Sequence, residues 1–439
     1  MNYSEAWEFL YNLQLFKIKL GLDSMEHFLA AVGDPHKDLR FIHVAGTNGK
    51  GSVSATLLAI LARAGYRVGL YTSPHLVSVR ERFRINDALI SEEDFAGLAT
   101  VIREVLDNRQ ITYFEFTTAL ALLWFARERV DMAILEVGMG GRLDATNVIW
   151  PEVALITNVA MDHEAHLGNT LAEIAREKAG IIKPLVPVVS GAADDVTREV
   201  MIRTCADLNA PLYLLDRDFS ASTAADNTWA YKGIFTSLSG LRCRLVGRHQ
   251  TSNSALALAT LEILDKKNVR VDEAAVRSGL MEVSWPGRLE HFLLPAPPCP
   301  SASESRCYLL DGAHNPAAVN ILKEALQNDF SFERLILVWA SMLDKDYRSM
   351  LAIIAPLVTH IVLTAVDIER AAPPHLLQEA LPPKCRSRSR CVSPVPEALS
   401  AAARLAGPRD LICISGSLYL VGEARHLLLV GQAGNGAGR

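Results

Sequence analysis

A glycine-rich stretch near the amino terminus has the residue types and the order needed to hold phosphate. It consists of Gly46, Thr47, Asn48, Gly49, Lys50, Gly51 and Ser52. Small residues let backbone N–H groups approach phosphate oxygens, and a helix that begins there adds partial positive charge. We expect Lys50 against the β- and γ-phosphates of a nucleotide and the Ser52 hydroxyl near a metal ion. The alternative is a simple turn, because Gly51 separates a lysine and a hydroxyl residue that are adjacent in the general P-loop pattern.

Three further polar residues follow apolar runs that are typical of buried strands. Ser73 follows residues 66–71, Glu136 lies near the end of 132–137, and His163 follows 153–158. The carboxyl ends of parallel strands meet at one edge of a sheet, where α/β proteins place their ligands. Carboxylate and hydroxyl oxygens suit Mg²⁺ that is bound together with phosphates. The alternatives are an ion pair of Glu136 with Arg142, a turn serine, and a structural histidine.

Four other candidates carry weak signals when each is taken alone. Lys178, in Arg176-Glu177-Lys178, is typical of a solvated helix face. Arg288 follows a Trp-Pro-Gly turn, and Asp311 and His314 lie in Asp-Gly-Ala-His-Asn-Pro, whose Asp-Gly and Asn-Pro pairs are typical of turns.

The elements that must position these residues alternate between strands and helices. The apolar run Phe41–Val44 predicts a buried parallel strand directly before the glycine stretch, and Val53–Ala64 predicts the helix after it. Helices are also predicted over 3–31 with a break at Gly21, and over 91–106, 114–129, 170–182 and 250–266, while 227–246 is strand-like. This order predicts an α/β domain with a mainly parallel sheet over residues 1–285.

A second, smaller α/β domain is predicted over residues 286–430. Its strands are expected at 308–311, 335–339, 360–364 and 411–415, with helices between them. Residues 295–306 are rich in proline and serine and are expected to form a flexible loop, and 431–439 a disordered tail.

Composition excludes several classes of protein. The 439 residues, at about 150 per domain, allow two or three domains. A formal charge of −5 argues against a nucleic-acid partner. Seven cysteines without a CxxC pair fit a reducing compartment. Since neither a secretory signal nor an apolar run of about 18 residues is apparent, we expect a cytoplasmic protein without a membrane partner.

Taken together, the motifs resemble the folylpolyglutamate synthase/dihydrofolate synthase family of Mur-ligase-like amide synthetases. The ordered set is GTNGKGS, TSPHL, FEFTTALAL, LEVGMGGRLDATN, ITNVAMDHEAHLG, EKAGIIK, GRHQTSN, WPGRLE, DGAHNP, DKD and SGSLYLVGE. The resemblance runs from about Gly21 to Glu423. Departures from the family pattern at Asp34, at Met139 and in the insert before Tyr308 touch no proposed ligand.

The resemblance implies a role for each candidate. The glycine stretch, Asn253, Arg288 and Asp311 would bind ATP, and Ser73, Glu136 and His163 would bind Mg²⁺. Lys178 would be carboxylated by CO₂, its carbamate helping to hold a second Mg²⁺, and Lys50, Lys178 and His314 would be catalytic. The pterin would lie near Thr112, Tyr113, Phe114, Glu115, Leu143, Asp144 and Ala145.

The implied reaction joins L-glutamate to dihydropteroate or to reduced folates through an acyl phosphate, and it consumes ATP. The second domain would be the glutamate-ligase domain, and the enzyme would be a monomer. A cell-wall Mur ligase would need roughly 100 further residues before a glycine stretch that begins here at residue 46. A non-enzymatic nucleotide switch would leave Glu136, His163 and the second domain without a role.

Overall fold

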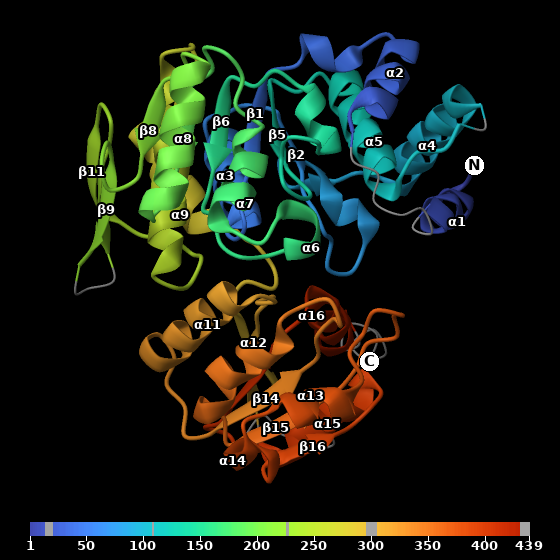
Figure 1. The fold of residues 1–439 in the computed structure, drawn as a ribbon, viewed down its shortest axis with the longest axis vertical. Helices are drawn as coiled ribbons and strands as arrows, with labels where there is room; N and C mark the ends of the chain where they lie inside the picture. Colours follow the sequence, from blue (N-terminus) through green and yellow to red (C-terminus); the bar gives the residue numbers. More distant parts are fainter. Residues whose placement is uncertain (14–20, 108, 225–227, 296–304, 431–439) are drawn as a thin grey trace, which may run out of the picture. The chain divides into compact units, whose positions relative to one another are not determined.

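The computed structural model describes residues 1–13, 21–107, 109–224, 228–295 and 305–430. The chain divides into two compact units (Figure 1). The first unit comprises Met1–Arg244 and Gln250–Ser284, and the second comprises Leu245–His249 and Trp285–Arg439. Within the described residues, every helix is too short or too polar to cross a bilayer.

The first unit is built on an eight-stranded sheet with the order β4-β3-β2-β5-β1-β6-β7-β8. The strands are β1 (Phe41–Ala45), β2 (Val68–Tyr71), β3 (Phe83–Ile85), β4 (Ala88–Leu89), β5 (Met132–Glu136), β6 (Val153–Ile156), β7 (Val188–Ser190) and β8 (Leu212–Leu214). From β2 to β8 all neighbours are parallel, and β3 and β4 add an antiparallel edge. Every residue of β1, β2, β5 and β6 is buried, as expected when helices cover both faces of a parallel sheet.

Helices surround this sheet. They are α1 (Tyr3–Leu13), α2 (Asp23–Ala31), α3 (Lys50–Arg63), α4 (Glu92–Leu106), α5 (Tyr113–Arg127), α6 (Glu164–Leu167), α7 (Leu171–Ala179), α8 (Asp195–Asp207), α9 (His249–Asp265) and α10 (Glu273–Glu282). Phe116 and Phe125 of α5 share one apolar core with Phe41, Tyr71 and Leu135 of the sheet. Helix α3 contacts β1, β2, β5 and α10. The phosphate-loop helix is therefore held between the sheet and α10.

A separate three-stranded antiparallel sheet lies beyond β8 and α8 at one side of this unit (Figure 1). It consists of β9 (Ser220–Thr223), β10 (Trp229–Lys232) and β11 (Ser237–Leu241). The Glu262 carboxylate of α9 accepts hydrogen bonds from the N–H groups of Ile234 (2.7 Å) and Thr236 (2.9 Å). These hydrogen bonds hold the turn between β10 and β11 against α9.

The second unit has a six-stranded sheet with the order β12-β13-β17-β14-β15-β16. The strands are β12 (Glu290–Pro295), β13 (Ser305–Leu310), β14 (Leu335–Trp339), β15 (His360–Leu363), β16 (Ser389–Cys391) and β17 (Leu411–Ser415). The helices are α11 (Pro316–Asn328), α12 (Tyr347–Ile354), α13 (Pro374–Ala380), α14 (Pro383–Arg386), α15 (Val395–Leu405) and α16 (Leu418–Arg425). Only β12 is antiparallel to its neighbour, and the core includes Trp339, Leu322 and Ile354.

The predicted α/β class, with a P-loop-type parallel sheet and a smaller Rossmann-like unit, is confirmed. The flexible loop predicted over 295–306 is wrong at both ends, because Pro295 pairs with Ser305 and Arg306 pairs with Leu294 in the β12–β13 hairpin. Residues 296–304 of that loop and the predicted tail 431–439 lie outside the described residues. The edge strands β12 and β16 were not predicted, because exposed residues interrupt the apolar pattern in both.

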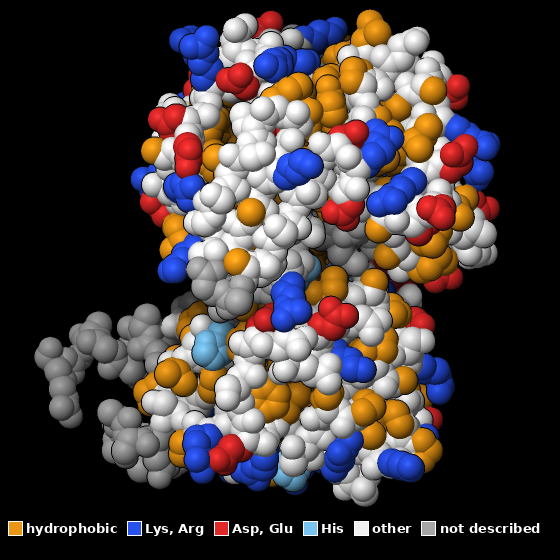
Figure 2. Space-filling model, turned by 90° about the vertical axis from the view of Figure 1, so that its left-hand side faces the viewer, with side chains coloured by type: hydrophobic (Ala, Val, Ile, Leu, Met, Phe, Trp, Pro, Cys, Tyr) orange, Lys and Arg blue, Asp and Glu red, His pale blue; other side chains and the backbone are white. Residues whose placement is uncertain are grey.

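Charges of both signs are interspersed over the face of the molecule in Figure 2. With a net charge of −5, this is the pattern of an ordinary solvated surface.

Candidate functional site

The glycine stretch forms a tight loop between β1 and α3, and two of its glycines are required by close contacts. Gly46 has a φ of +148°, and a Cβ atom there would overlap the Thr157 hydroxyl. Gly49 has a φ of +83°, and a Cβ atom would lie 2.7 Å from Asn253 Oδ1. The loop is therefore enclosed by the segment after β6 on one side and by Asn253 of α9 on the other.

The backbone N–H groups of the loop have different roles. Those of Thr47 and Asn48 donate to the carbonyl and the side-chain oxygen of Asn158, at 3.0 and 2.9 Å. The first helical bond of α3 runs from Val53 N to Gly49 O, and the N–H groups of a helix's first turn have no acceptor within the helix. The groups oriented for an anion are thus those of residues 49–52.

Lys50 and Ser52 lie in the first turn of α3, which begins three residues before the helix predicted over Val53–Ala64. Lys50 Nζ donates to the carbonyls of Gly46 (3.0 Å) and Thr47 (3.2 Å), so the positive charge of Lys50 lies against the glycine-rich loop. The buried Ser52 hydroxyl accepts a long hydrogen bond from Gln250 Nε2 (3.4 Å), and Gln250 Oε1 accepts from Asn253 Nδ2 (2.9 Å). This chain of amides joins α9 to the hydroxyl expected near the metal.

The predicted metal ligands come from consecutive strands of the sheet. In the order β2-β5-β1-β6, Ser73 follows β2, Glu136 ends β5, the phosphate loop follows β1, and His163 follows β6. Glu136 is buried and lies opposite Val44. His163 adopts a left-handed conformation before α6, and its side chain is 38% exposed. The sheet topology therefore brings these residues to the same edge as the phosphate loop.

The donor set fits a hard cation bound with phosphate. A buried carboxylate at the end of β5 and a serine hydroxyl beside β2 are oxygen ligands of the kind that Mg²⁺ takes. Arg142, the alternative partner of Glu136, instead pairs with Glu177 at 2.8 Å. Within the described residues, no group of three or more His, Cys, Asp or Glu side chains is arranged for a metal ion.

Lys178 differs most from its local sequence pattern. It is 3% exposed, so its interpretation as part of a solvated helix face is wrong. The buried face of α7 consists of Ile174, Ala175, Lys178 and Ala179, and the i, i+4 spacing from Ile174 is the signal that could have revealed it. Burial, together with the nearby Lys50 charge, lowers the pKa of Lys178 to about 7, although Asp162 and Asp144 act in the opposite direction. The structure thus brings two predicted catalytic lysines close enough to interact.

The predicted pterin residues form two adjacent segments. Thr112 and Glu115 make a capping box at the start of α5, with Thr112 N donating to Glu115 Oε2 at 2.7 Å and Glu115 N to Thr112 Oγ1 at 3.2 Å. The Phe114 ring lies against Gly138, where a Cβ atom would approach it to 2.5 Å. Tyr113 lies under the guanidinium of Arg82, whose central carbon is 5.1 Å from the ring centroid. Residues 112–115 therefore face the loop that contains 143–145.

Asp144 has a structural role within that loop. It is buried, and Oδ2 accepts hydrogen bonds from the N–H groups of Gly138 and Met139, both at 3.0 Å. Oδ1 accepts from Thr146 N (3.0 Å) and Thr146 Oγ1 (2.6 Å). Burial raises the pKa of Asp144, and these hydrogen bonds act against the rise. Binding of a pterin by Leu143, Asp144 or Ala145 stays a prediction.

In the second unit, Arg288, Asp311 and His314 occupy neighbouring turns. Asp311 is buried and accepts hydrogen bonds from Leu289 N and Ala313 N, both at 3.0 Å. Burial raises the pKa of Asp311, and the charge of Arg288 opposes this. His314 Nδ1 lies 2.8 Å from the Gly312 carbonyl, directly before α11. Within this unit the structure brings together Arg288 and Asp311, which were predicted to bind ATP, and His314, which was predicted to be catalytic.

Comparison with known proteins identifies the family. The Mur ligase middle domain matches residues 44–261, and the Mur ligase glutamate ligase domain matches residues 300–418. The dihydrofolate synthase/folylpolyglutamate synthase of Bacillus subtilis is 34% identical, over 97% of this chain and 99% of its own length. This chain belongs to the dihydrofolate synthase/folylpolyglutamate synthase family. It is therefore an ATP-dependent ligase.

Solved structures of family members are similar to the structure of this chain over almost its whole length. Escherichia coli FolC in complex with DHPP and ADP has a TM-score of 0.88 at 30% identity, covering 98% of this chain and 99% of that one. A bifunctional folylpolyglutamate synthase/dihydrofolate synthase with Mn, AMPPNP and L-glutamate bound has a TM-score of 0.85 at 32% identity, covering 98% of each chain. The predicted family is thus confirmed, together with the use of ATP and a divalent metal.

Several residues of this family member were missed as site residues by sequence reasoning. Thr157 and Asn158 hold the first half of the phosphate loop, and Gln250 connects Asn253 with Ser52. Asp162, whose side chain is only 8% exposed, acts electrostatically on Lys178. The positions of Thr157 and Asn158 directly after a buried strand were the available signal.

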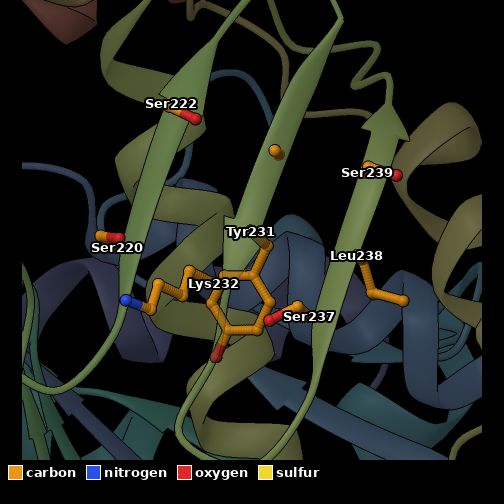
Figure 3. Close-up of a pocket in the computed structure, with 8 residues that line it drawn as sticks. Ser220, Ser222, Tyr231, Lys232, Ser237, Leu238 and Ser239 are labelled. Atoms are coloured by element: carbon orange, nitrogen blue, oxygen red, sulfur yellow. The ribbon is translucent and has the colours of Figure 1, made fainter.

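A pocket of about 250 Å³ lies elsewhere, on the three-stranded sheet (Figure 3). It is lined by Ser220, Ser222, Ala230, Tyr231, Lys232, Ser237, Leu238 and Ser239. None of the ligase residues described above contributes to it, so it has no part in the assignment of the site.

Proposed function

We propose that this chain is a bifunctional dihydrofolate synthase and folylpolyglutamate synthase. It adds L-glutamate to dihydropteroate and to the γ-carboxylate of reduced folates, releasing ADP and phosphate. The observation that carries the proposal is the sheet edge where Ser73, Glu136 and the phosphate loop follow adjacent strands. Lys178 lies near this loop, and burial, followed by the charge of Lys50, lowers the pKa of Lys178 to about 7.

The reaction begins with attack of the acceptor carboxylate on the γ-phosphate of ATP, which yields an acyl phosphate and ADP. Lys50 and the N–H groups of residues 49–52 hold the phosphates and stabilise the charge that grows on the transferred group. Ser73, Glu136 and His163 would hold Mg²⁺, which would supply further neutralisation of the phosphate charge. The glutamate amine then attacks the acyl carbon and displaces phosphate.

Lys178 supports a second metal site in this proposal. With a pKa of about 7, a large share of its amine is neutral at physiological pH, and a neutral amine is the form that attacks CO₂. The amine nitrogen would bond to the carbon of CO₂ and release one proton, and the resulting carbamate would offer an anionic oxygen ligand for a second Mg²⁺. Burial favours the neutral amine over an ammonium, and the neighbouring charge of Lys50 disfavours a second cation and would favour an anion in its place.

The second unit completes the enzyme. Arg288 and Asp311 are proposed to contact the nucleotide and His314 to act in catalysis. Water must be excluded, since it would hydrolyse the acyl phosphate, so the cycle includes closure over the substrates. We place the enzyme in the cytoplasm as a monomer. None of the six described cysteines is in a disulfide bond, which suits a reducing compartment.

The deciding experiment measures ADP release by the purified chain with Mg²⁺, using dihydropteroate and tetrahydrofolate as separate acceptors. Release that requires both L-glutamate and an acceptor supports the ligase, and activity with each acceptor supports bifunctionality. If dihydropteroate gives no product while tetrahydrofolate does, the chain is a folylpolyglutamate synthase alone.

A further inference from the structure

A side-chain amide outside the glycine motif holds the phosphate loop in shape. Asn158 follows β6, and its Oδ1 accepts from Asn48 N at 2.9 Å while its Nδ2 donates to Asn48 O at 3.0 Å. Its own carbonyl accepts from Thr47 N at 3.0 Å. One primary amide thus bonds both backbone groups of a loop residue, as a neighbouring strand would.

The residues on either side of Asn158 strengthen this attachment. Thr157 Oγ1 donates to the same Asn48 carbonyl at 2.6 Å and lies against Gly46. Two residues further on, Ala160 N donates to Thr47 Oγ1 at 3.0 Å. Because three residues of one segment together form these five hydrogen bonds with the loop, the first half of the loop is fixed before any ligand binds.

This attachment selects which N–H groups can meet a ligand. The N–H groups of Thr47 and Asn48 are already used by Asn158, which leaves those of residues 49–52 at the start of α3. An anion bound there gains the helix N-terminus and Lys50 together. A loop that is already in its binding conformation loses little freedom when the ligand arrives.

We propose that Asn158 is a positioning residue for the phosphate groups of ATP. Its side-chain amide turns the Asn48 peptide away from the ligand, while its main-chain carbonyl holds the Thr47 N–H, and the N–H groups of residues 49–52 are thereby directed at the phosphates. This inference rests on the proposed function, because the phosphates that Asn158 positions are those consumed in the proposed ligation.

The test is Asn158→Ala, compared with Asn86→Ala as a matched control. Asn86 makes the same kind of bonds, with Oδ1 accepting from Val68 N (2.8 Å) and Nδ2 donating to Tyr66 O (3.2 Å), but at the amino end of β2. Residue 86 has a φ of +50°, which strains an alanine, so Asn86→Ala should destabilise the fold at least as much as Asn158→Ala does. We expect Asn158→Ala to raise Kd for ADP and KM for ATP roughly tenfold or more, with KM for the pterin acceptor unchanged. Asn86→Ala is expected to lower Tm and to leave Kd for ADP and KM for ATP unchanged.

An ADP affinity within twofold of wild type in Asn158→Ala would overturn the proposal, whatever the change in Tm. If that variant does not fold, Asn158→Ser, which retains one polar partner for Asn48, should bind ADP more weakly than wild type, and wild-type affinity would again overturn it. Calorimetric titration of ADP without acceptor decides this inference. Acceptor-dependent release of ADP decides the proposed function, so the role of Asn158 and the proposed function are tested by different measurements and can fail separately.

Discussion

Replacing Lys178 by methionine is expected to abolish ligation and yet to stabilise the ligand-free protein near neutral pH. Burial and the neighbouring Lys50 charge lower the pKa of Lys178 from 10.5 to about 7. At about 1.4 kcal/mol for each pKa unit, the folded protein disfavours the ammonium by roughly 5 kcal/mol. Methionine retains an apolar stem of similar length and carries no charge, so this penalty disappears.

The pH dependence has a definite sign. Between about pH 7 and pH 10 the unfolded lysine is protonated while the folded one has largely lost its proton, so the unfolded state binds more protons and stability rises with pH. From about pH 7 to about pH 8.5 this single group should raise the free energy of unfolding by about 1.5 kcal/mol. In Lys178→Met that increment should be missing.

The assay is urea denaturation in metal-free, CO₂-free buffer at these two pH values. Wild type and Lys232→Met, which replaces an exposed lysine of the small sheet, should both show the rise in midpoint. The reasoning is refuted if Lys178→Met shows the same rise, since the burial of Lys178 would then not control its protonation. Normal turnover by Lys178→Met would refute the carbamate.

Further substitutions test the rest of the site. Lys50→Ala should lower turnover at least about 1,000-fold with an unchanged circular dichroism spectrum, because the lysine acts on phosphate charge in the transition state; near-normal turnover would mean that the loop does not hold ATP. Gly46→Ala should abolish ADP binding in calorimetry and destabilise the protein by roughly 1–3 kcal/mol, because its Cβ atom would overlap the Thr157 hydroxyl. Asp144→Ala removes the acceptor of four hydrogen bonds and should cost roughly 2–4 kcal/mol in urea denaturation. Its kcat/KM should fall more for dihydropteroate than for tetrahydrofolate, and equal losses would argue against separate pterin positions. In Lys178→Ala, acetate or formate should restore part of the ADP release if an anionic oxygen is what the site lacks, whereas no restoration at any concentration would speak against that role.

Local patterns were sufficient where one stretch of sequence determines both the element and its ligand. The run Phe41–Val44 followed by glycines predicted strand, loop and helix, and these became β1 and α3. Glu136 was found because a carboxylate that ends an apolar strand requires a partner or a site. Such inferences need only the alternation of apolar runs and turns.

The remaining features depend on residues that are distant in sequence. Asn158 contacts Asn48 across 110 positions, so neither residue signals the other locally. Lys178 looked solvated because its neighbour Glu177 does form an exposed ion pair, with Arg142, while Lys178 itself faces inward. Composition was misleading at Pro295 and Ser305, because backbone pairing of an edge strand does not require apolar side chains.

The order in which the chain visits its two units bears on how the protein is made. The chain leaves the first unit at Leu245, returns at Gln250 and leaves again at Trp285. Helix α10, whose Gly279 approaches the backbone of Ile60 so closely that a Cβ atom would lie 2.6 Å from its Cα atom, therefore emerges from the ribosome long after α3. Asn253 follows Gly49 by about 200 residues, which at 5–20 residues per second is roughly 10–40 s of synthesis. Throughout that interval the phosphate loop of the nascent chain lacks its contact with Asn253 of α9, and the surface of α3 that packs against α10 is exposed. Chaperones that protect exposed apolar surface during translation would therefore act before residue 284 emerges, and a gene truncated at residue 244 would encode an incomplete nucleotide-binding unit.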